Sequence, residues 1–393
     1  SFLEVPYLAV AAAAVVPSFL YFFGLFVQID SYAARNGVKG LPRDEIPSVA
    51  KTISEGWFFI FGFLLLIYLL IYLKREAHAP FYATIALLAL SQFGKLKSRD
   101  PWYYIVGLGI VSYIGIILLS VHMPASLTTT LPFGAGIVLL VLCHIPTHVR
   151  VSSERVMEFV ESSGRLLVEL VAILAAVGLI VGGLMMTGMA SSFSGEITRV
   201  AGGKLVPLLL MGALTAFILG VGMTVTAAYI LLAIVLAPAL IGLGLDPIAV
   251  HLFILYWGMI SFITPPVALG AFAAASLAGS GPMRTGLEAM RFGSVIYFLP
   301  FFFVLNPALV LHGEIITILV ETGSAIAGIV LIASGLQGHL VFLGSFSEDA
   351  RSFVARVILV SGGLALAYPE MISNVAGLAA LLLAVILRPQ KPV

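Results

Sequence analysis

Two breaks interrupt the apolar stretches in the second half of the chain and concentrate its polar groups. Residues 220–226 read Gly-Val-Gly-Met-Thr-Val-Thr, and residues 261–266 read Ser-Phe-Ile-Thr-Pro-Pro. Proline lacks an N–H and its ring clashes with the preceding turn, so two successive prolines cannot continue a helix. Non-helical backbone is tolerated at membrane depth only where it faces protein or a water-filled cavity. We therefore expect both breaks to present carbonyl and hydroxyl oxygens that can bind a ligand.

Oxygen groups of this kind suit a hard cation such as sodium. Secondary transporters place carbonyls and hydroxyls of interrupted helices on sodium and turn half-helix N-termini toward substrate anions. The predicted ion-binding residues are Gly220, Gly222, Thr224, Thr226, Ser261 and Thr264, with the carbonyl of Phe262 as a further candidate. Two alternatives stay open, since the hydroxyls can simply hydrogen-bond to helix carbonyls and the breaks can be kinks packed against neighbouring helices. No metal beyond sodium and no cofactor is expected.

Other side chains with possible chemistry have simpler interpretations. Asp246-Pro247 predicts an N-cap followed by proline in the first helical turn, rather than an ion ligand. His251 fits a hydrogen-bonded packing residue better than a proton carrier. Cys143, with His144 and His148, resembles a metal cluster, but an intervening proline prevents a shared helix face, so a metal site is not predicted. Because Cys143 is the single cysteine, no intrachain disulfide is possible.

Intramembrane proteolysis is the enzyme activity considered. Aspartyl proteases of this class resemble a Tyr-Asp and Gly-x-Gly-Asp pair, but residues 242–246 read Gly-Leu-Gly-Leu-Asp and no Tyr-Asp is present. The nearest approach to a serine motif, Ser334-Gly335 with His339, places nucleophile and base five residues apart on different faces of a helix. The sequence predicts no enzyme.

The composition predicts an integral membrane protein. Hydrophobic residues make up 61% and charged residues 10% of the chain, whereas soluble domains carry about 25% charged residues. The mean hydropathy is +1.13, so lipid must solvate most of the apolar surface. The net charge of +1 and the absence of a basic run argue against a nucleic-acid partner.

Apolar runs predict an all-α fold with about 11 crossings and one re-entrant helical hairpin. The hairpin is predicted at 205–243 and a broken crossing at 247–279. The remaining spans are predicted at 7–29, 57–73, 80–94, 102–121, 131–148, 165–189, 293–311, 314–340, 353–368 and 371–387. With the N-terminus outside, the inner loops are predicted at 30–56, 95–101, 147–165, 279–292, 345–356 and the C-terminal tail, and the outer loops near 74–79 and 195–204. The inner loops hold 16 of the 20 lysines and arginines, as the positive-inside rule requires. This arrangement requires the hairpin to enter and leave on the outer side.

Several motifs resemble a known family. They are Gly-Met-Thr-Val-Thr-Ala-Ala-Tyr-Ile-Leu-Leu-Ala at 222–233, Ala-Pro-Ala-Leu at 237–240, Ile-Thr-Pro-Pro-Val-Ala-Leu at 263–269, Pro-Phe at 300–301, Asn-Pro-Ala-Leu at 306–309 and Phe-Leu-Glu-Val-Pro-Tyr at 2–7, with 35–42 beyond it. Together they resemble the large membrane (permease) subunit of tripartite ATP-independent periplasmic (TRAP) transporters. The similarity is strongest to the fused form that works with TAXI-type solute-binding proteins.

The resemblance implies an elevator-type fold of inverted repeats, with substrate bound between two hairpin tips and sodium near each tip. On this chain it implies Thr226, Pro265 and Pro266 as substrate-binding residues. The chain departs from the family pattern at two positions, and each departure removes a possible side-chain ligand. The family usually has Pro-Thr-Thr where this chain has Thr224-Val225-Thr226. It usually has Asp or Asn where this chain has Phe262. Backbone carbonyl coordination is compatible with both changes.

The resemblance also implies that the chain is the C-terminal part of a larger assembly. An N-terminal repeat and a small membrane domain are expected as partners, together with a periplasmic TAXI-type binding protein and the lipid bilayer. We expect 1–189 to be scaffold and arm helices, 190–292 the transport-domain hairpin and broken helix, and 293–393 C-terminal scaffold helices. Ser1 opens the chain in place of Met, so a preceding segment is expected.

The predicted function is sodium-coupled import of a small organic acid across a bacterial or archaeal cytoplasmic (inner) membrane. The resemblance implies a small carboxylate as substrate, yet neither break contains an arginine to bind one. Half-helix N-termini, or the absent repeat, must then supply the positive potential. The alternative is a non-transporting fragment or scaffold subunit that needs the missing N-terminal half.

Overall fold

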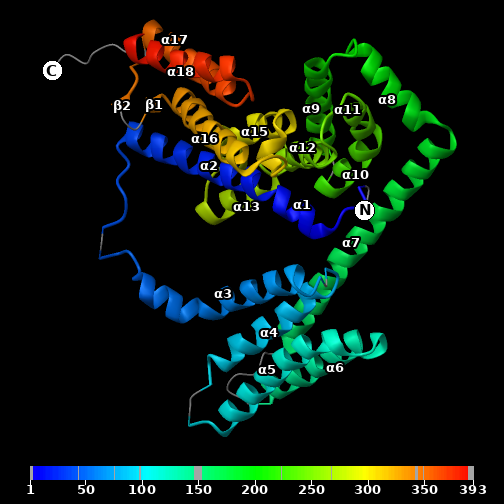
Figure 1. The fold of residues 1–393 in the computed structure, drawn as a ribbon. Helices are drawn as coiled ribbons and strands as arrows, with labels where there is room; N and C mark the ends of the chain where they lie inside the picture. Colours follow the sequence, from blue (N-terminus) through cyan, green and yellow to red (C-terminus); the bar gives the residue numbers. More distant parts are fainter. Residues whose placement is uncertain are drawn as a thin grey trace. The chain divides into compact units, whose positions relative to one another are not determined.

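The computed structural model is built almost entirely of α-helices, as the sequence predicts (Figure 1). It describes residues 3–42, 44–74, 76–96, 99–145, 153–222, 224–266, 268–340, 344–347 and 349–387. Two strands of two residues each, β1 (His339–Leu340) and β2 (Gly344–Ser345), form an antiparallel pair in which His339 lies opposite Ser345. The described part of the chain is therefore all-α apart from this one short strand pair.

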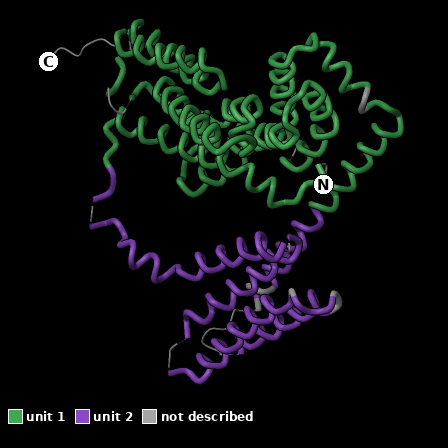
Figure 2. Tube along the Cα trace, in the orientation of Figure 1, with its two compact units in different colours: residues 1–39, 170–393 green, residues 40–169 purple. Residues whose placement is uncertain are grey.

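The chain divides into two units, which Figure 2 colours separately. Unit 2 comprises residues 40–169, and unit 1 comprises residues 1–39 and 170–393. Unit 2 contains α3 (Val49–Ile71), α4 (Ala79–Phe93), α5 (Pro101–Leu119), the 3₁₀ turn η1 (Ser120–His122) and α6 (Ala125–His144). Its core is apolar and includes Leu69, Tyr82, Tyr113 and Ile117. The boundary between the units falls within α7 (Ser153–Met186).

Unit 1 holds both sequence breaks. In chain order its helices are α1 (Tyr7–Ala13), α2 (Val15–Asn36), α8 (Met189–Val200), α9 (Leu205–Gly222), α10 (Val225–Val235), α11 (Ala237–Gly242), α12 (Pro247–Met259), η2 (Ile260–Phe262), α13 (Leu269–Ala278), α14 (Pro282–Phe292), α15 (Val295–Leu305), η3 (Pro307–Val310), α16 (Ile315–Gln337), α17 (Ala350–Leu366) and α18 (Met371–Leu387). The largest apolar core joins α2, α9, α12, α15 and α16. A second, smaller core joins α16, α17 and α18.

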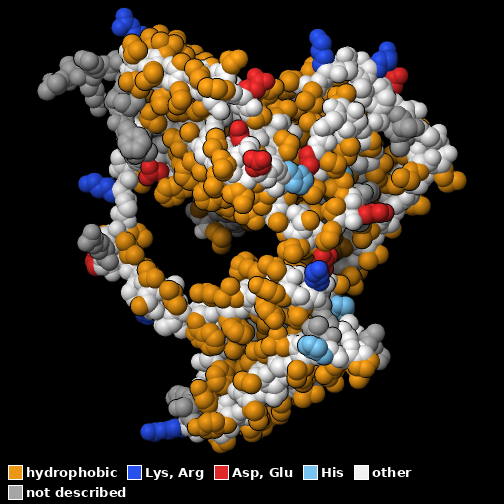
Figure 3. All heavy atoms as spheres, viewed as in Figure 1, with side chains coloured by type: hydrophobic (Ala, Val, Ile, Leu, Met, Phe, Trp, Pro, Cys, Tyr) orange, Lys and Arg blue, Asp and Glu red, His pale blue; other side chains and the backbone are white. Residues whose placement is uncertain are grey.

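Helix length and exposure fit a membrane protein. Within the described residues, 7 helical segments are long and apolar enough to cross a bilayer by themselves, and further apolar helices are shorter. Large apolar side chains are exposed along these helices, and hydrophobic atoms cover much of the face seen in Figure 3. Lipid can solvate such surfaces, whereas water cannot do so at this scale. The number of crossings stays a prediction.

The structure corrects the predicted boundaries at three places. Helix α2 continues to Asn36, where a loop was predicted from residue 30. The predicted loops at 195–204 and 279–292 contain the whole second half of α8 and all of α14. Both helices are short and amphipathic, so their apolar residues never form the long uninterrupted run that identifies a span.

Polar contacts join the second half of α2 to its neighbours, and one of them, from Arg35, lies in the part of α2 that was not predicted. Gln337 of α16 donates from Nε2 to Oε1 of Gln28, and Gln28 donates from Nε2 to the hydroxyl of Ser294, which precedes α15. Arg35 donates from Nη1 to the Gln337 carbonyl at 2.8 Å. Arg356 of α17 donates to the carbonyls of Gly335 and Leu336 at 2.8 and 2.7 Å. These arginines satisfy terminal carbonyls of α16 and counter its negative end.

Candidate functional site

The broken helix starts at a capped N-terminus. Asp246 caps α12, because its Oδ1 accepts from the N–H of Ala249 at 2.9 Å, and Pro247 occupies the first turn. This confirms the cap predicted from sequence. The other carboxylate oxygen of Asp246 lies 2.7 Å from Nδ1 of His312, in the turn between η3 and α16. The N-terminal end of the broken helix is therefore tied to the loop that precedes α16.

The helical pattern of α12 is lost across the second predicted break. Helix α12 tightens into η2 at residues 260–262, and α13 begins only at Leu269. Ala268, immediately before α13, has φ +29° and ψ +46°, a region that L-residues with a side chain rarely occupy. The Phe262 carbonyl oxygen lies 3.2 Å from the position that a Cβ on Gly270 would take, so it is packed against the first turn of α13. The second predicted break is thus a real interruption of the helix.

The hairpin contains the first break. Helix α9 ends at Gly222 and α10 begins at Val225, with Met223 outside the described residues. Thr224 caps α10, since its hydroxyl oxygen accepts from the N–H of Ala227 at 3.4 Å. The turn between the limbs therefore lies where the glycines and threonines predicted it.

The two breaks are brought together through glycines. A Cβ placed on Gly220 of α9 would lie 3.3 Å from the Gly258 carbonyl oxygen and 3.7 Å from that of Trp257. A Cβ on Gly258 would in turn lie 3.7 Å from Cγ1 of Val225, at the start of α10. Both limbs of the hairpin thus contact α12 one turn before its break, and α9 approaches closely enough that a side chain at position 220 would press on the Gly258 carbonyl. Figure 1 shows α9, α10 and α12 close together in unit 1.

A second hydrogen bond joins the hairpin to the broken helix. The hydroxyl of Tyr229, on α10, lies 3.0 Å from Nδ1 of His251 on α12. His251 is buried, and its contact with Tyr229 matches the packing interpretation made from sequence.

The predicted hydroxyls differ in exposure and in partners. Ser261 and Thr264 are buried, with 6% and 3% of their surface exposed, whereas Thr224 and Thr226 are exposed. The Ser261 hydroxyl donates to the Gly258 carbonyl at 3.0 Å, as the back-bonding alternative expects. A hydroxyl that donates its hydrogen keeps lone pairs that can coordinate a cation, so this bond leaves a ligand role open.

Thr264 has a partner that the sequence did not reveal. Its Oγ1 lies 3.2 Å from the hydroxyl of Tyr297, on α15. The Tyr297 ring is 6.1 Å, centroid to centroid, from that of Trp257. The Trp257 indole N–H is buried and has no hydrogen-bond partner within the described residues. Tyr297 and Trp257 thus add two hydrogen-bonding groups beside the break. The sequence contains one weak signal for them, namely a tyrosine and a tryptophan within otherwise apolar helices.

Helix α14 packs directly on the break. A Cβ on Gly286 would lie 2.7 Å from Cγ of Pro265, closer than real Cβ contacts occur. A Cβ on Gly293 would lie 2.7 Å from Cδ1 of Ile263. Pro265 is half-buried and Pro266 is exposed, and the peptide bond between them is cis. Gly286, within α14, and Gly293, directly after it, therefore allow α14 to approach the Ile-Thr-Pro-Pro segment.

Comparison with protein families identifies the chain. The family model described as "Tripartite ATP-independent periplasmic transporter, DctM component" matches residues 1–102 and 98–318. The chain belongs to this family. No curated protein and no solved structure matches it.

Membership of the TRAP transporter family fixes the general role of the protein. It is a multi-pass membrane component of a transporter, and the family implies a periplasmic binding protein and a small membrane subunit as partners. The matched residues include the hairpin and the broken helix. A permease of this family is a transporter component and not a member of an enzyme family.

A transition-metal site in the described part of this TRAP permease would need a cluster of metal-binding side chains. The described residues contain no group of three or more His, Cys, Asp and Glu side chains able to hold a metal ion. Cys143 is buried in α6, and His148 lies outside the described residues.

Proposed function

We propose that this TRAP permease couples sodium movement to the uptake of a small organic acid, with the ion bound between the hairpin and the broken helix. The observation that carries the proposal is the close packing of Gly220 and Val225 around Gly258, next to both breaks. Transport in this family is ATP-independent, so an ion gradient is the natural source of energy. The binding protein would be of the TAXI type, and the permease would lie in a bacterial or archaeal cytoplasmic membrane.

Sodium fits the available groups better than a divalent ion does. The proposed ligands are neutral oxygens, namely carbonyls of Gly220, Gly222 and Phe262 and hydroxyls of Thr224, Thr226, Ser261 and Thr264. Sites for calcium normally include carboxylates, which strengthen binding through their charge. Neither break contains an acidic residue. A monovalent cation can be held by neutral oxygens and still be released, which a transport cycle needs.

The organic acid would bind beside the ion, near Thr226, Pro265 and Pro266. Helices α10 and α13 both begin at a break, and helix N-termini attract anions through unpaired N–H groups and the helix dipole. The unpartnered indole N–H of Trp257 and the hydroxyl of Tyr297 are further donors close to the second break. This arrangement compensates for the absence of lysine and arginine in the breaks.

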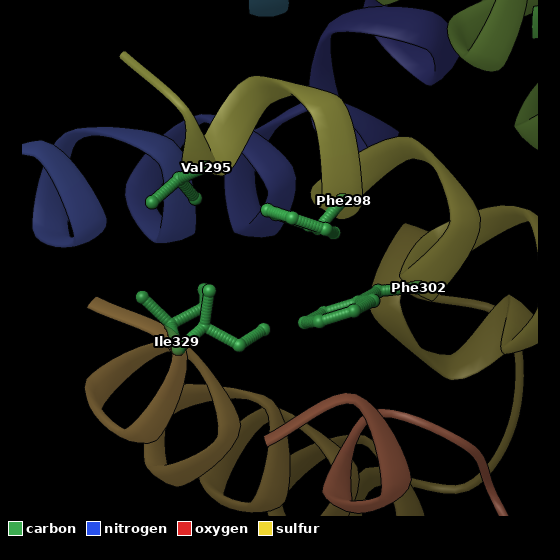
Figure 4. Close-up of a pocket in the computed structure, with 5 residues that line it drawn as sticks. Val295, Phe298, Phe302 and Ile329 are labelled. Carbon is green, nitrogen blue, oxygen red and sulfur yellow. The ribbon is translucent and has the colours of Figure 1, made fainter. Parts of the chain in front are cut away.

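An apolar crevice elsewhere in unit 1 is unsuited to an acid. It is lined by Val295, Phe298, Phe302, Ile329 and Ile332, four of which are labelled in Figure 4. None of these side chains can donate a hydrogen bond, and burying a carboxylate without donors is costly. The breaks, which supply donors and oxygens together, are the better site.

Elevator-type motion would carry the hairpin and the broken helix as one body. The contacts at Gly258 and the bond from Tyr229 to His251 join them. The second candidate function is a scaffold subunit that would transport only together with an N-terminal repeat, because the family resemblance implies a site formed between two hairpin tips.

Sodium-dependent stability and uptake test the proposal. The thermal unfolding temperature of the purified chain should be higher in sodium chloride than in equal potassium chloride, because a ligand that binds only the folded state stabilises it by about 2.7 kcal/mol at 100 times its dissociation constant. Proteoliposomes with the binding protein and N-terminal partners should take up labelled dicarboxylates or amino acids only with an inward sodium gradient. The chain alone should show the stability effect without uptake. Equal stability in both salts, with gradient-independent uptake by the complete assembly, would refute sodium coupling.

A further inference from the structure

Helix α14 has an exposed face that combines apolar and basic side chains. Met283 and Leu287 expose 54% and 61% of their surface, and Arg284 and Arg291 are exposed beside them. Because a helix advances about 100° per residue, these four positions occupy one continuous arc roughly 100° wide. The apolar pair lies at one edge of the arc and the basic pair at the other.

A different face of α14, outside the exposed arc, contacts the second break. Gly286 packs against Pro265 and Gly293 packs against Ile263, each with room only for hydrogen in place of a side chain. A movement of α14 is therefore transmitted most directly to Pro265, whose ring meets Gly286, whereas the contact at Gly293 is made to the flexible end of the Ile263 side chain.

Positive charge dominates the exposed arc. Nη1 of Arg291 lies 3.7 Å from the Glu288 carboxylate, and its guanidinium lies 5.5 Å from the centre of the Tyr32 ring. Arg284 forms no ion pair with any residue that the structure describes. Glu288 thus offsets part of one arginine charge, and the other remains available to an external anion.

We propose that α14 lies in the headgroup layer of the membrane and binds an anionic phospholipid, which steadies the break at 261–266. The apolar edge of the arc would contact acyl chains and the arginines would contact the lipid phosphate, the pattern of an interfacial amphipathic helix. The chain on either side supports this placement, since α14 directly joins α13 and α15, both strongly apolar. Its effect on the ion site rests on the proposed function, whereas lipid binding by α14 does not.

The depth of α14 in a bilayer can be measured with a spin label. In a Cys143→Ala background, Leu287→Cys would carry a nitroxide, and its accessibility to oxygen and to a water-soluble nickel complex would be compared in two kinds of vesicle. One kind is phosphatidylcholine, and the other is phosphatidylcholine mixed with phosphatidylglycerol. We expect the label to move toward the hydrocarbon when phosphatidylglycerol is present.

Arginine variants separate charge binding from simple apolar insertion. Arg284→Gln should abolish most of the shift and weaken phosphatidylglycerol association about fivefold, the effect of one basic residue at an anionic surface. Arg291→Gln should have a smaller effect because of its contact with Glu288. A matched control is α8, which is also amphipathic but pairs Arg199 with Glu196 at 2.7 Å. A label at Phe193→Cys should respond weakly to phosphatidylglycerol, with or without Arg199→Gln.

Two outcomes would overturn the proposal. If the label at position 287 reports the same depth in both vesicles, or the same shift in Arg284→Gln, α14 does not bind anionic lipid. If depth shifts but a nitroxide at Phe262→Cys, a site that is 45% exposed, keeps the same mobility, the lipid does not act on the break. Neither measurement uses sodium, so a failure of sodium coupling would be seen separately in the unfolding experiment.

Discussion

The two breaks contain similar residue types but differ in how their polar groups are held. At the hairpin tip, Thr224 and Thr226 are exposed and the Thr224 hydroxyl caps α10. In the broken helix, Ser261 and Thr264 are buried and bonded to Gly258 and Tyr297. The hairpin tip thus presents its hydroxyls outward, while the broken helix holds them in a packed environment.

Within the proposed ion site, this difference predicts distinct roles for the two segments. A buried hydroxyl with a fixed partner is preorganised and loses little entropy when it meets an ion. An exposed threonine at a turn costs little to rearrange and can close over a ligand after it arrives. We therefore expect the broken helix to set ion affinity and the hairpin tip to contribute less, with both depending on the glycine contact between them.

Substituting Gly220 should change stability and its dependence on sodium more than any other variant, because Gly220 lies at the contact between the two segments. In Gly220→Leu the side chain would meet the backbone carbonyl of Gly258, which cannot move without distorting α12. We expect destabilisation of about 1–3 kcal/mol from overpacking, together with loss of the stability difference between sodium and potassium. Thermal unfolding in the two salts measures both quantities.

The control for Gly220 is another helical glycine with open surroundings. No atom of the described residues would lie within 4 Å of a Cβ on Gly178 of α7, so Gly178→Leu should leave both quantities nearly unchanged. If Gly220→Leu behaved like Gly178→Leu, the hairpin and the broken helix would not depend on their contact.

A substitution in α14, which packs on the break at 261–266, should lower stability and sodium affinity less than the substitution of Gly220. In Gly286→Ala the new methyl group would lie 2.7 Å from Cγ of Pro265, a ring carbon with little freedom to move. The break should shift by a few tenths of an ångström, at a cost of about 1 kcal/mol, and sodium affinity should fall while the hairpin contacts persist. Gly183→Ala, in an open position on α7, is the matched control. Unchanged sodium affinity in Gly286→Ala would show that the break does not depend on α14.

Sequence patterns identified the breaks well because their signals are local. Glycine, proline and threonine within apolar runs predicted the ends of α9 and α12, and Asp246 with Pro247 predicted the start of α12. The family, too, was apparent from motifs around these breaks. Helices α8 and α14 were missed because their apolar residues are spaced at helical intervals and never form a long run.

The partners of the site residues were beyond sequence reasoning for a different reason. Tyr297 lies 33 residues after Thr264, and Gly220 lies 38 positions before Gly258, in another helix. Nothing in a single sequence says which of the many small or aromatic residues in apolar helices will meet. Only the packing of α9, α12, α14 and α15 selects these pairs.

Removing single hydroxyls should change stability and sodium affinity least. Comparing a hydroxyl in each break shows which break contributes more to sodium affinity. Thr264→Val keeps the shape of a buried side chain and removes an oxygen that contacts Tyr297 at 3.2 Å. Loss of that hydrogen bond should cost about 1 kcal/mol of stability in either salt, and loss of a ligand should further lower sodium affinity. Tyr297→Phe removes the same hydrogen bond and leaves the Thr264 oxygen in place, so it should reproduce the first effect without the second.

The corresponding exchange at the hairpin tip should lower sodium affinity less. Thr224→Val removes an exposed hydroxyl and the cap of α10, while the carbonyls of Gly220 and Gly222 remain to coordinate the ion. Thr224→Ser retains the cap and serves as the control, so any stability loss of about 1 kcal/mol in the valine variant is assigned to capping. Sodium titrations followed by thermal unfolding would rank Thr264→Val, Thr224→Val and Thr224→Ser by their sodium affinity. A larger loss of sodium affinity in Thr224→Val than in Thr264→Val would reverse the proposed roles, because the exposed tip, and not the packed break, would then hold the principal ligand.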